Sequence, residues 1–178
     1  GGFDAKGAVA DLKRSMRLAP DALFVLCAVC NAYPDFTRVE HPDEVWRRED
    51  GSVVCGTAGS CLEGYDDMGI PDTNRWPWVS YASPSWRRAI EENLTAIVAE
   101  LRRTGLSKRV VGIHLAGYHD AQFYSPFTDV SPCARAEYRA YLAEGGHVST
   151  NYAFFSKQLG VRAQEAFARA FKRAMGKD

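Results

Sequence analysis

The sequence lacks an excess of charge of either sign. Lysine and arginine together number 22, as do aspartate and glutamate, and the formal net charge at pH 7 is zero. Because nucleic acids and anionic membranes attract basic proteins, this balance argues against both classes of partner. The longest apolar run, residues 22–30, is far shorter than the roughly 20 residues that a membrane-spanning helix needs. We therefore expect no nucleic-acid partner and no membrane partner.

Recognisable cofactor and metal motifs are also missing. The glycine-rich stretch of residues 51–59 does not run from a strand into a helix, as a phosphate-binding loop requires. His41, Asp43 and Glu44 lie close together, but their spacing matches no strong ligand motif, and Pro42 breaks any helical register. We predict neither a metal site nor a cofactor. The sequence does not assign a cellular compartment.

Cysteine is odd in number, with five residues. Cys27 and Cys30 have C-x-x-C spacing, but they lie in an apolar run that reads as a strand, where residues three apart point to opposite faces. We expect both to be buried thiols rather than a metal or redox pair. Cys55 and Cys61 flank the glycine-rich loop and could form a disulfide in an oxidising compartment, so their redox state stays open.

The sequence does contain the alternation of strand and helix patterns that is typical of parallel α/β folds. Residues 22–30 and 110–116 are nearly continuous apolar runs, which predicts strands buried on both faces. Between them, residues 83–103 carry an apolar stripe at helical spacing, and Ser83 and Pro84 are good start signals for this helix. We expect the two strands to be parallel and adjacent or near-adjacent, joined through this helix by a right-handed crossover.

Two long loops follow the two predicted strands. Residues 33–82 are rich in proline, glycine and tryptophan, and residues 118–132 are polar and aromatic. Further helices are predicted at residues 8–18, 134–143 and 161–175 from their apolar spacing. In parallel α/β folds, sites are built from the loops at the carboxyl ends of the strands. We therefore expect the functional residues to lie on the two long loops.

The loop after the second strand carries a carboxylate, an imidazole and an amide. Asp120 is the candidate general acid, and capping of the loop through backbone amides is its alternative role. His119 is placed to orient Asp120 or to bind a hydroxyl, and Tyr118 and Gln122 are further candidates for substrate binding. His114 lies within the strand, so we expect it to be a core histidine outside the site.

The loop after the first strand supplies aromatic candidates. Tyr33 and Asp35 follow the strand end directly, and we assign both to substrate binding. Trp76 and Trp78 are candidate platforms, because flat indole faces stack on the apolar faces of sugar rings. Packing of the long loop is the alternative role of both tryptophans. Together these residues predict a carbohydrate site.

The order of these motifs resembles that of β-galactosidase-like glycoside hydrolases. The segments that carry the resemblance are His41-Pro-Asp-Glu-Val-Trp46, Asp50-Gly51, Ser80-Tyr-Ala-Ser-Pro-Ser-Trp-Arg87, Val111-Gly-Ile-His-Leu-Ala-Gly117 and Tyr138-Arg-Ala-Tyr-Leu142. The resemblance covers most of the chain. It implies a (β/α)8 barrel that hydrolyses a glycosidic bond with retention, by means of two carboxylates.

Two departures from the family pattern bear on activity. Such enzymes place a glutamate after this strand, whereas this chain has Asp120 and Gln122, so Asp120 would have to donate the proton. A retaining pair of carboxylates stands about 5–5.5 Å apart, and the family takes its nucleophile from a later strand. We expect residues 1–178 to be a single domain and a segment of such a barrel, with residues 33–82 as a long loop or insertion. Its partners are then a carbohydrate substrate and either the remaining barrel segment or a second copy.

Two other functions stay open from the sequence. A non-catalytic carbohydrate-binding protein, or a degenerate barrel, would keep the aromatic loops without the acid pair, and Gln122 favours it. A small α/β interaction domain would pair its strand edges with another chain, and the presence of only two strong strand patterns favours that function. The sugar and its linkage are not specified by the sequence.

Overall fold

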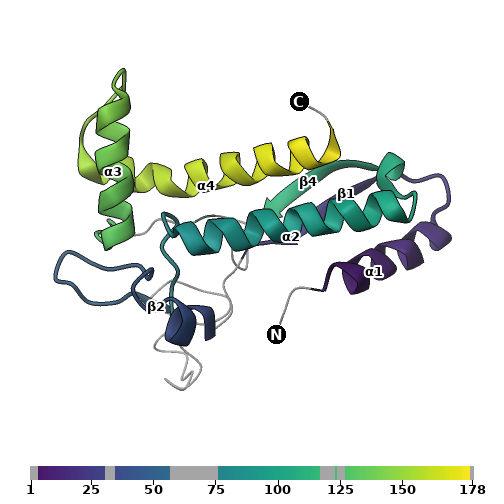
Figure 1. The fold of residues 1–178 in the computed structure, drawn as a ribbon, viewed down its shortest axis with the longest axis horizontal. Coiled ribbons are helices and arrows are strands. Elements are labelled where there is room, and N and C mark those ends of the chain that lie inside the picture. The colour runs from purple at the N-terminus through teal and green to yellow at the C-terminus, as the bar shows by residue number, and fades with distance from the viewer. Residues whose placement is uncertain (1–3, 31–34, 57–75, 117–122, 124–126, 177–178) are drawn as a thin grey trace.

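The computed structural model describes residues 4–30, 35–56, 76–116, 123 and 127–176. The elements, in chain order, are α1 (Ala5–Leu18), β1 (Phe24–Val29), the π-helical turn η1 (Phe36–Glu40), β2 (Cys55–Gly56), β3 (Trp76–Pro77), α2 (Pro84–Arg103), the 3₁₀ turn η4 (Ser107–Arg109), β4 (Val110–Ala116), α3 (Pro132–Glu144) and α4 (Tyr152–Met175). Figure 1 shows α4, α2 and α1 side by side, whereas β2 and α3 lie at the opposite end from the start of β4.

The two main strands form a parallel pair. β1 and β4 are hydrogen-bonded neighbours and are joined through α2, which confirms the predicted pairing. Their register shifts by one residue near the start: Phe24 pairs with Val110, but Val25 pairs with Gly112. This shift is a β-bulge that leaves Val111 as the extra residue of β4. The described part of the chain is thus mixed α/β with a two-stranded parallel sheet, together with a short antiparallel pair of β2 and β3.

Local signals in the sequence determine where α2 begins and ends. The Ser83 side chain accepts a hydrogen bond from the backbone N–H of Trp86, and Pro84 occupies the first turn. At the other end, Thr104 caps the helix and Gly105, with φ of 72°, turns the chain toward η4 and β4. The apolar stripe of the helix is buried along its whole length, at Trp86, Ile90, Leu94, Val98 and Leu101. These features confirm the helix predicted at residues 83–103.

The helix α4 begins nine residues before its predicted start. Asn151 caps it by accepting a hydrogen bond from the N–H of Phe154. Gly160 lowers helix propensity, which is why the apolar spacing alone predicts a helix only from residue 161. In the fold Gly160 is buried, and a Cβ at this position would lie 3.0 Å from the Cβ of Phe123. The glycine therefore lets α4 approach the segment that follows β4. Helices α1 and α3 are confirmed close to their predicted bounds.

All three long helices pack against the same face of the parallel sheet. One core cluster joins buried residues of α1, α2, β4 and α4, and partly buried residues of both strands pack against it. Its buried members are Val9, Met16, Val98, Leu101, Val110 and Phe171. The strand residues beside them include Phe24, Leu26 and Ile113. None of the described helices is long and apolar enough to cross a membrane.

The other face of the sheet is uncovered by the described residues. Val25 and Val29 are each 62% exposed and Val111 is 52% exposed, whereas the alternate residues of β1, Phe24, Leu26 and Ala28, are partly buried. The prediction that both strands are buried on both faces is therefore wrong for the described structure. The physical reason is that α1, α2 and α4 form one layer on one side, so each strand buries only alternate side chains.

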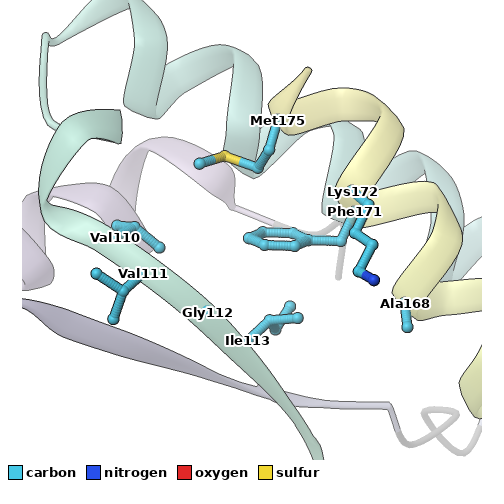
Figure 2. Close-up of a pocket in the computed structure, with 8 residues that line it drawn as sticks. All are labelled: Val110, Val111, Gly112, Ile113, Ala168, Phe171, Lys172 and Met175. Carbon is cyan, nitrogen blue, oxygen red and sulfur yellow. The ribbon is translucent and has the colours of Figure 1, made fainter. Parts of the chain in front are cut away.

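A cavity of about 290 Å³ lies between the outer edge of β4 and the overhanging end of α4. Figure 2 shows the side chains of Phe171 and Met175 on α4 and those of Val110 and Ile113 on β4 around this space. Its lining is apolar except for Lys172. The helix α4 therefore extends beyond the edge of the sheet, over a space that no described strand fills.

Candidate functional site

The segments that follow β1 and β4 are joined to one another beyond the carboxyl ends of the strands. The backbone N–H of Val130 donates to the carbonyl of Arg47 at 2.9 Å, and the N–H of Arg47 donates to Oδ1 of Asp129 at 3.4 Å. Figure 1 shows the same end of the molecule carrying η1, β2 and α3. Because parallel α/β folds place their sites at this end, the junction is the candidate functional region.

Asp129 is the centre of the junction and is only 2% exposed. Its carboxylate accepts hydrogen bonds from the hydroxyl of Ser80 at 2.5 Å and from the N–H of Ser131 at 2.9 Å. Its backbone is held as well, because its N–H donates to the Ser156 hydroxyl at 2.7 Å and its carbonyl accepts from the Tyr152 hydroxyl at 2.5 Å. Asp129 thus connects both loops to the start of α4.

Burial sets the protonation behaviour of this centre. Desolvation raises the pKa of Asp129, and the hydrogen bonds from Ser80, Ser131 and Arg47 lower it only in part. Burial also raises the pKa of Tyr152 to about 12, with a smaller contribution from the charge of Asp129. A carboxylate with no access to solvent and with its oxygens already occupied cannot meet a substrate, so Asp129 has a structural role.

A second carboxylate, Glu44, fixes the first loop to the start of α2. It accepts hydrogen bonds from the hydroxyls of Ser83 at 2.5 Å and Ser85 at 2.7 Å, and from the N–H of Ser85 at 3.1 Å. Partial burial raises the pKa of Glu44, but these hydrogen bonds and the nearby His41 together lower it by more, so the net shift is downward. An anionic carboxylate is well placed here, because the N-terminus of a helix is partially positive.

Aromatic rings fill the interior below the junction. Trp46 lies 6.3 Å from Trp78 and 5.4 Å from Tyr81 between ring centroids, and Tyr81 lies 5.4 Å from Phe123. Trp78 is 0% exposed, so it offers no face to a sugar in this structure and has the packing role. Trp76, in β3, is only partly buried. Of the two predicted platforms, Trp76 is the one that remains open to a ligand.

A hollow of about 490 Å³ opens between the two loops. The first loop lines it with Arg48, Glu49 and Asp50, and the second with Phe127 and Thr128. The guanidinium of Arg48 lies 4.8 Å from the ring centroid of Phe127. Such a mixture of an aromatic ring, carboxylates and a guanidinium suits a polar ring that carries several hydroxyl groups.

Asp50 shapes the turn at the rim of this hollow. Its carboxylate accepts hydrogen bonds from the Ser52 N–H at 2.8 Å and from the Ser52 hydroxyl at 2.6 Å, and these bonds hold the pKa of Asp50 below its usual range. Sequence reasoning singled out Asp50 only through the family resemblance. It missed the other four lining residues. Almost 80 positions separate the two parts of the lining, so no local pattern in the sequence connects them.

Several predicted site residues fall outside the described structure; they are Tyr33, Tyr118, His119, Asp120 and Gln122. Asp35 is described, and it is exposed at the residue just before η1. Among the described residues no group of three or more histidine, cysteine, aspartate or glutamate side chains could hold a metal ion.

Two predictions about buried residues on the strands need correction. His114 is exposed rather than part of the core, and Cys27 is exposed rather than buried. Both side chains belong to the sheet face that the helices do not cover. Cys30 is 3% exposed, which confirms the prediction of a buried thiol at that position. Cys61 lies outside the described residues.

No protein-family model, no curated protein and no solved structure matches the chain. The function of the chain is therefore inferred from its own residues and geometry.

Proposed function

We propose that the chain is a carbohydrate-binding segment of a glycoside hydrolase, with the glycan held where the loops after β1 and β4 meet. The observation that carries the proposal is the hydrogen-bonded junction of these loops around Asp129, which frames a hollow of aromatic and charged side chains at the carboxyl end of a parallel strand pair. Sites of barrel enzymes are built from several such loops, which is the geometry that a sugar ring requires for simultaneous stacking and hydrogen bonding.

The proposed architecture is a (β/α)8 barrel. In such a barrel every helix lies outside the sheet, and the other sheet face points inward. The described helices follow this arrangement, since α1, α2 and α4 cover one face and leave Val25 and Val29 exposed on the other. The apolar cavity at the edge of β4, beneath α4, has the position that a further parallel strand would take (Figure 2).

In this proposal the catalytic acid is Asp120, in the loop that follows β4 in sequence, and Trp76 stacks on a sugar ring. Tyr33, Asp35, Tyr118, His119 and Gln122 bind substrate hydroxyls. A retaining mechanism needs a second carboxylate about 5–5.5 Å from the first, and the proposal takes it from another strand of the barrel. The 178-residue chain alone is therefore expected to bind glycans without hydrolysing them.

Titration of galacto-oligosaccharides, followed by tryptophan fluorescence, tests glycan binding. A saturable change is expected in the natural chain, and Trp76→Ala is expected to weaken it about tenfold, which corresponds to the loss of about 1.4 kcal/mol of stacking. Arg48→Ala tests the hollow in the same way. Arg88→Ala, which changes an exposed arginine of α2, is the matched control. No saturable change in the natural chain would contradict the proposal.

Kinetics of a complete barrel enzyme that contains this chain test the role of Asp120. Asp120→Asn is expected to slow glycosides with poor leaving groups far more than activated aryl glycosides, because only the former need a proton in the transition state. Equal losses on both substrates would assign Asp120 to loop capping. Hydrolysis of any glycoside by the 178-residue chain alone would contradict the proposal that the second carboxylate comes from another strand of the barrel.

A second candidate, the α/β interaction domain, is favoured by one observation. The large apolar side chains exposed on the uncovered sheet face and beside it are Leu23, Val25, Val29 and Val111. A partner protein that covers these side chains would bury the same apolar surface that the remaining strands would bury in a barrel. The two functions separate in the fluorescence titration, since an interaction domain gives no saturable response to glycans.

A further inference from the structure

A thiol and an imidazole face each other on the uncovered side of the parallel sheet. Cys27 of β1 and His114 of β4 are register partners, and Sγ of Cys27 lies 3.7 Å from Nδ1 of His114. This separation is within hydrogen-bonding range for sulfur. Both side chains are exposed, so a small molecule in solution can reach them.

The surroundings of this pair are apolar. The described neighbours on the same sheet face are Val25, Val29 and Gly112, none of which carries a charge. The pair also lies in the carboxyl-terminal half of both strands, toward the end where the two loops meet. Two rigid neighbouring strands thus hold the thiol and the imidazole in a fixed relative position, as nucleophilic catalysis and covalent modification both require.

Cys30 provides a contrast within the same strand region. Its thiol is buried, and burial, with a smaller contribution from Cys27, raises the pKa of Cys30 to about 12. A thiol with such a pKa stays protonated at neutral pH and does not react. Of the two cysteines with C-x-x-C spacing, only Cys27 therefore combines exposure with a base within reach.

We propose that Cys27 and His114 form a nucleophile–base pair that is modified covalently by small compounds with a soft electrophilic carbon. In the reaction, Sγ of Cys27 forms a bond to that carbon while the bond to the leaving group breaks, and the leaving group departs with the electron pair. The thiol proton passes to Nδ1 of His114 and from there to water. The pair lies on the sheet face that a complete barrel would turn inward, so the proposal is made for the 178-residue chain, in which this face is exposed.

Alkylation by iodoacetamide tests the pair, because iodide is the leaving group and the product is a stable thioether. The full 178-residue chain is treated at pH 7, and peptide mass spectrometry with fragment ions that separate residues 27 and 30 gives a rate for each thiol. Cys27 is expected to react more than about tenfold faster than Cys30. His114→Gln is expected to slow Cys27 at least about tenfold, a smaller effect than the roughly 10²–10⁴-fold typical of general bases in enzymes, and to leave the rate of Cys55 unchanged.

Repetition in concentrated urea separates the effect of the fold from that of the sequence. In the unfolded chain, His114→Gln is expected to leave the rate of Cys27 unchanged, because the two residues are 87 positions apart. Far-UV circular dichroism checks that the variant folds, and His114→Asn is a second variant if His114→Gln does not. An equal rate at Cys27 with and without the imidazole in the folded chain would overturn the proposal. A rate at Cys27 no faster than that at Cys30 would do so too. Neither result would bear on glycan binding.

Discussion

The carboxylate of Asp129 and the hydroxyl of Ser80 are 2.5 Å apart in the interior, although 49 positions separate them in the sequence. Ser80 belongs to the segment that enters α2, and Asp129 to the segment that enters α3. Their hydrogen bond makes the two βα loops one structural unit, whose shape depends on a single buried acid.

Replacement of Asp129 by alanine is expected to destabilise the fold by about 3 kcal/mol or more. The change leaves the buried N–H of Ser131 and that of Arg47 without their acceptor, and each such group costs about 1–3 kcal/mol. Urea unfolding followed by circular dichroism measures the loss. Asp50→Ala is the matched control: it removes an exposed aspartate that also binds backbone, and it is expected to cost clearly less, because water replaces its hydrogen bonds. Equal losses in the two variants would contradict the structural role of Asp129.

Glu44→Gln is expected to lower the free energy of unfolding by about 1–2 kcal/mol at pH 7. The folded-state pKa of Glu44 lies below its ordinary value of 4.5, so its contribution is complete above that pH. The contribution disappears as the pH falls through the lowered pKa, because protonation weakens the bonds from Ser83 and Ser85. Urea unfolding from pH 7 to pH 3 tests this dependence, with exposed Glu92→Gln as the control. A difference between variant and natural chain that does not change with pH would contradict it.

The contribution of Asp129 to stability is expected to depend on pH in the opposite direction. Its folded-state pKa is raised above the ordinary value of 3.8, so the folded protein binds this proton more tightly than the unfolded chain does. The stability of the natural chain relative to Asp129→Asn therefore increases as the pH falls through the raised pKa. This gain in stability is lost again as the pH rises. Paired urea titrations of the two proteins at several pH values measure the difference. A relative stability that decreases toward low pH would show that hydrogen bonding outweighs burial at this carboxylate.

Substitutions of Trp76 and Trp78, the two predicted platforms, are expected to differ in their effect on the stability of the fold. Trp78→Ala removes a fully buried ring and is expected to cost about 3–5 kcal/mol, the usual range for a large core side chain. Trp76→Ala removes a partly exposed ring and is expected to cost about 1 kcal/mol. Thermal and urea unfolding measure both values. A larger loss at Trp76 than at Trp78 would contradict the packing role assigned to Trp78.

The parts of the fold that the sequence predicts correctly are those with local signals. The helix α2 has its cap at Ser83 and its stripe from Trp86 to Leu101 within one stretch of chain, and the two apolar runs on either side suffice to predict the parallel pair. The uncovered face was not predictable, because an apolar run does not reveal which elements cover it. For the same reason, His114 was wrongly predicted to lie in the core.

The junction of the loops could not be predicted for a different reason. Asp129 has no motif around it, and its importance comes from its contacts with Ser80 and Arg47, both more than 40 positions away. The lining of the hollow likewise combines residues 48–50 with residues 127–128. Only the folded chain brings such sets together, whereas the sequence indicates no more than that both loops follow strands.

The bulge at the start of β4 decides which side chains share the open side of the sheet. Val110 points toward the helices, and an unbroken alternation from there would send His114 inward and Ile113 outward. The inserted residue, Val111, reverses the phase, so that Ile113 and Leu115 pack inward and the imidazole emerges opposite Cys27. The position of the imidazole beside the thiol therefore depends on how the strand accommodates Val111: with the same residues in unbroken alternation, the two groups would lie on opposite faces of the sheet.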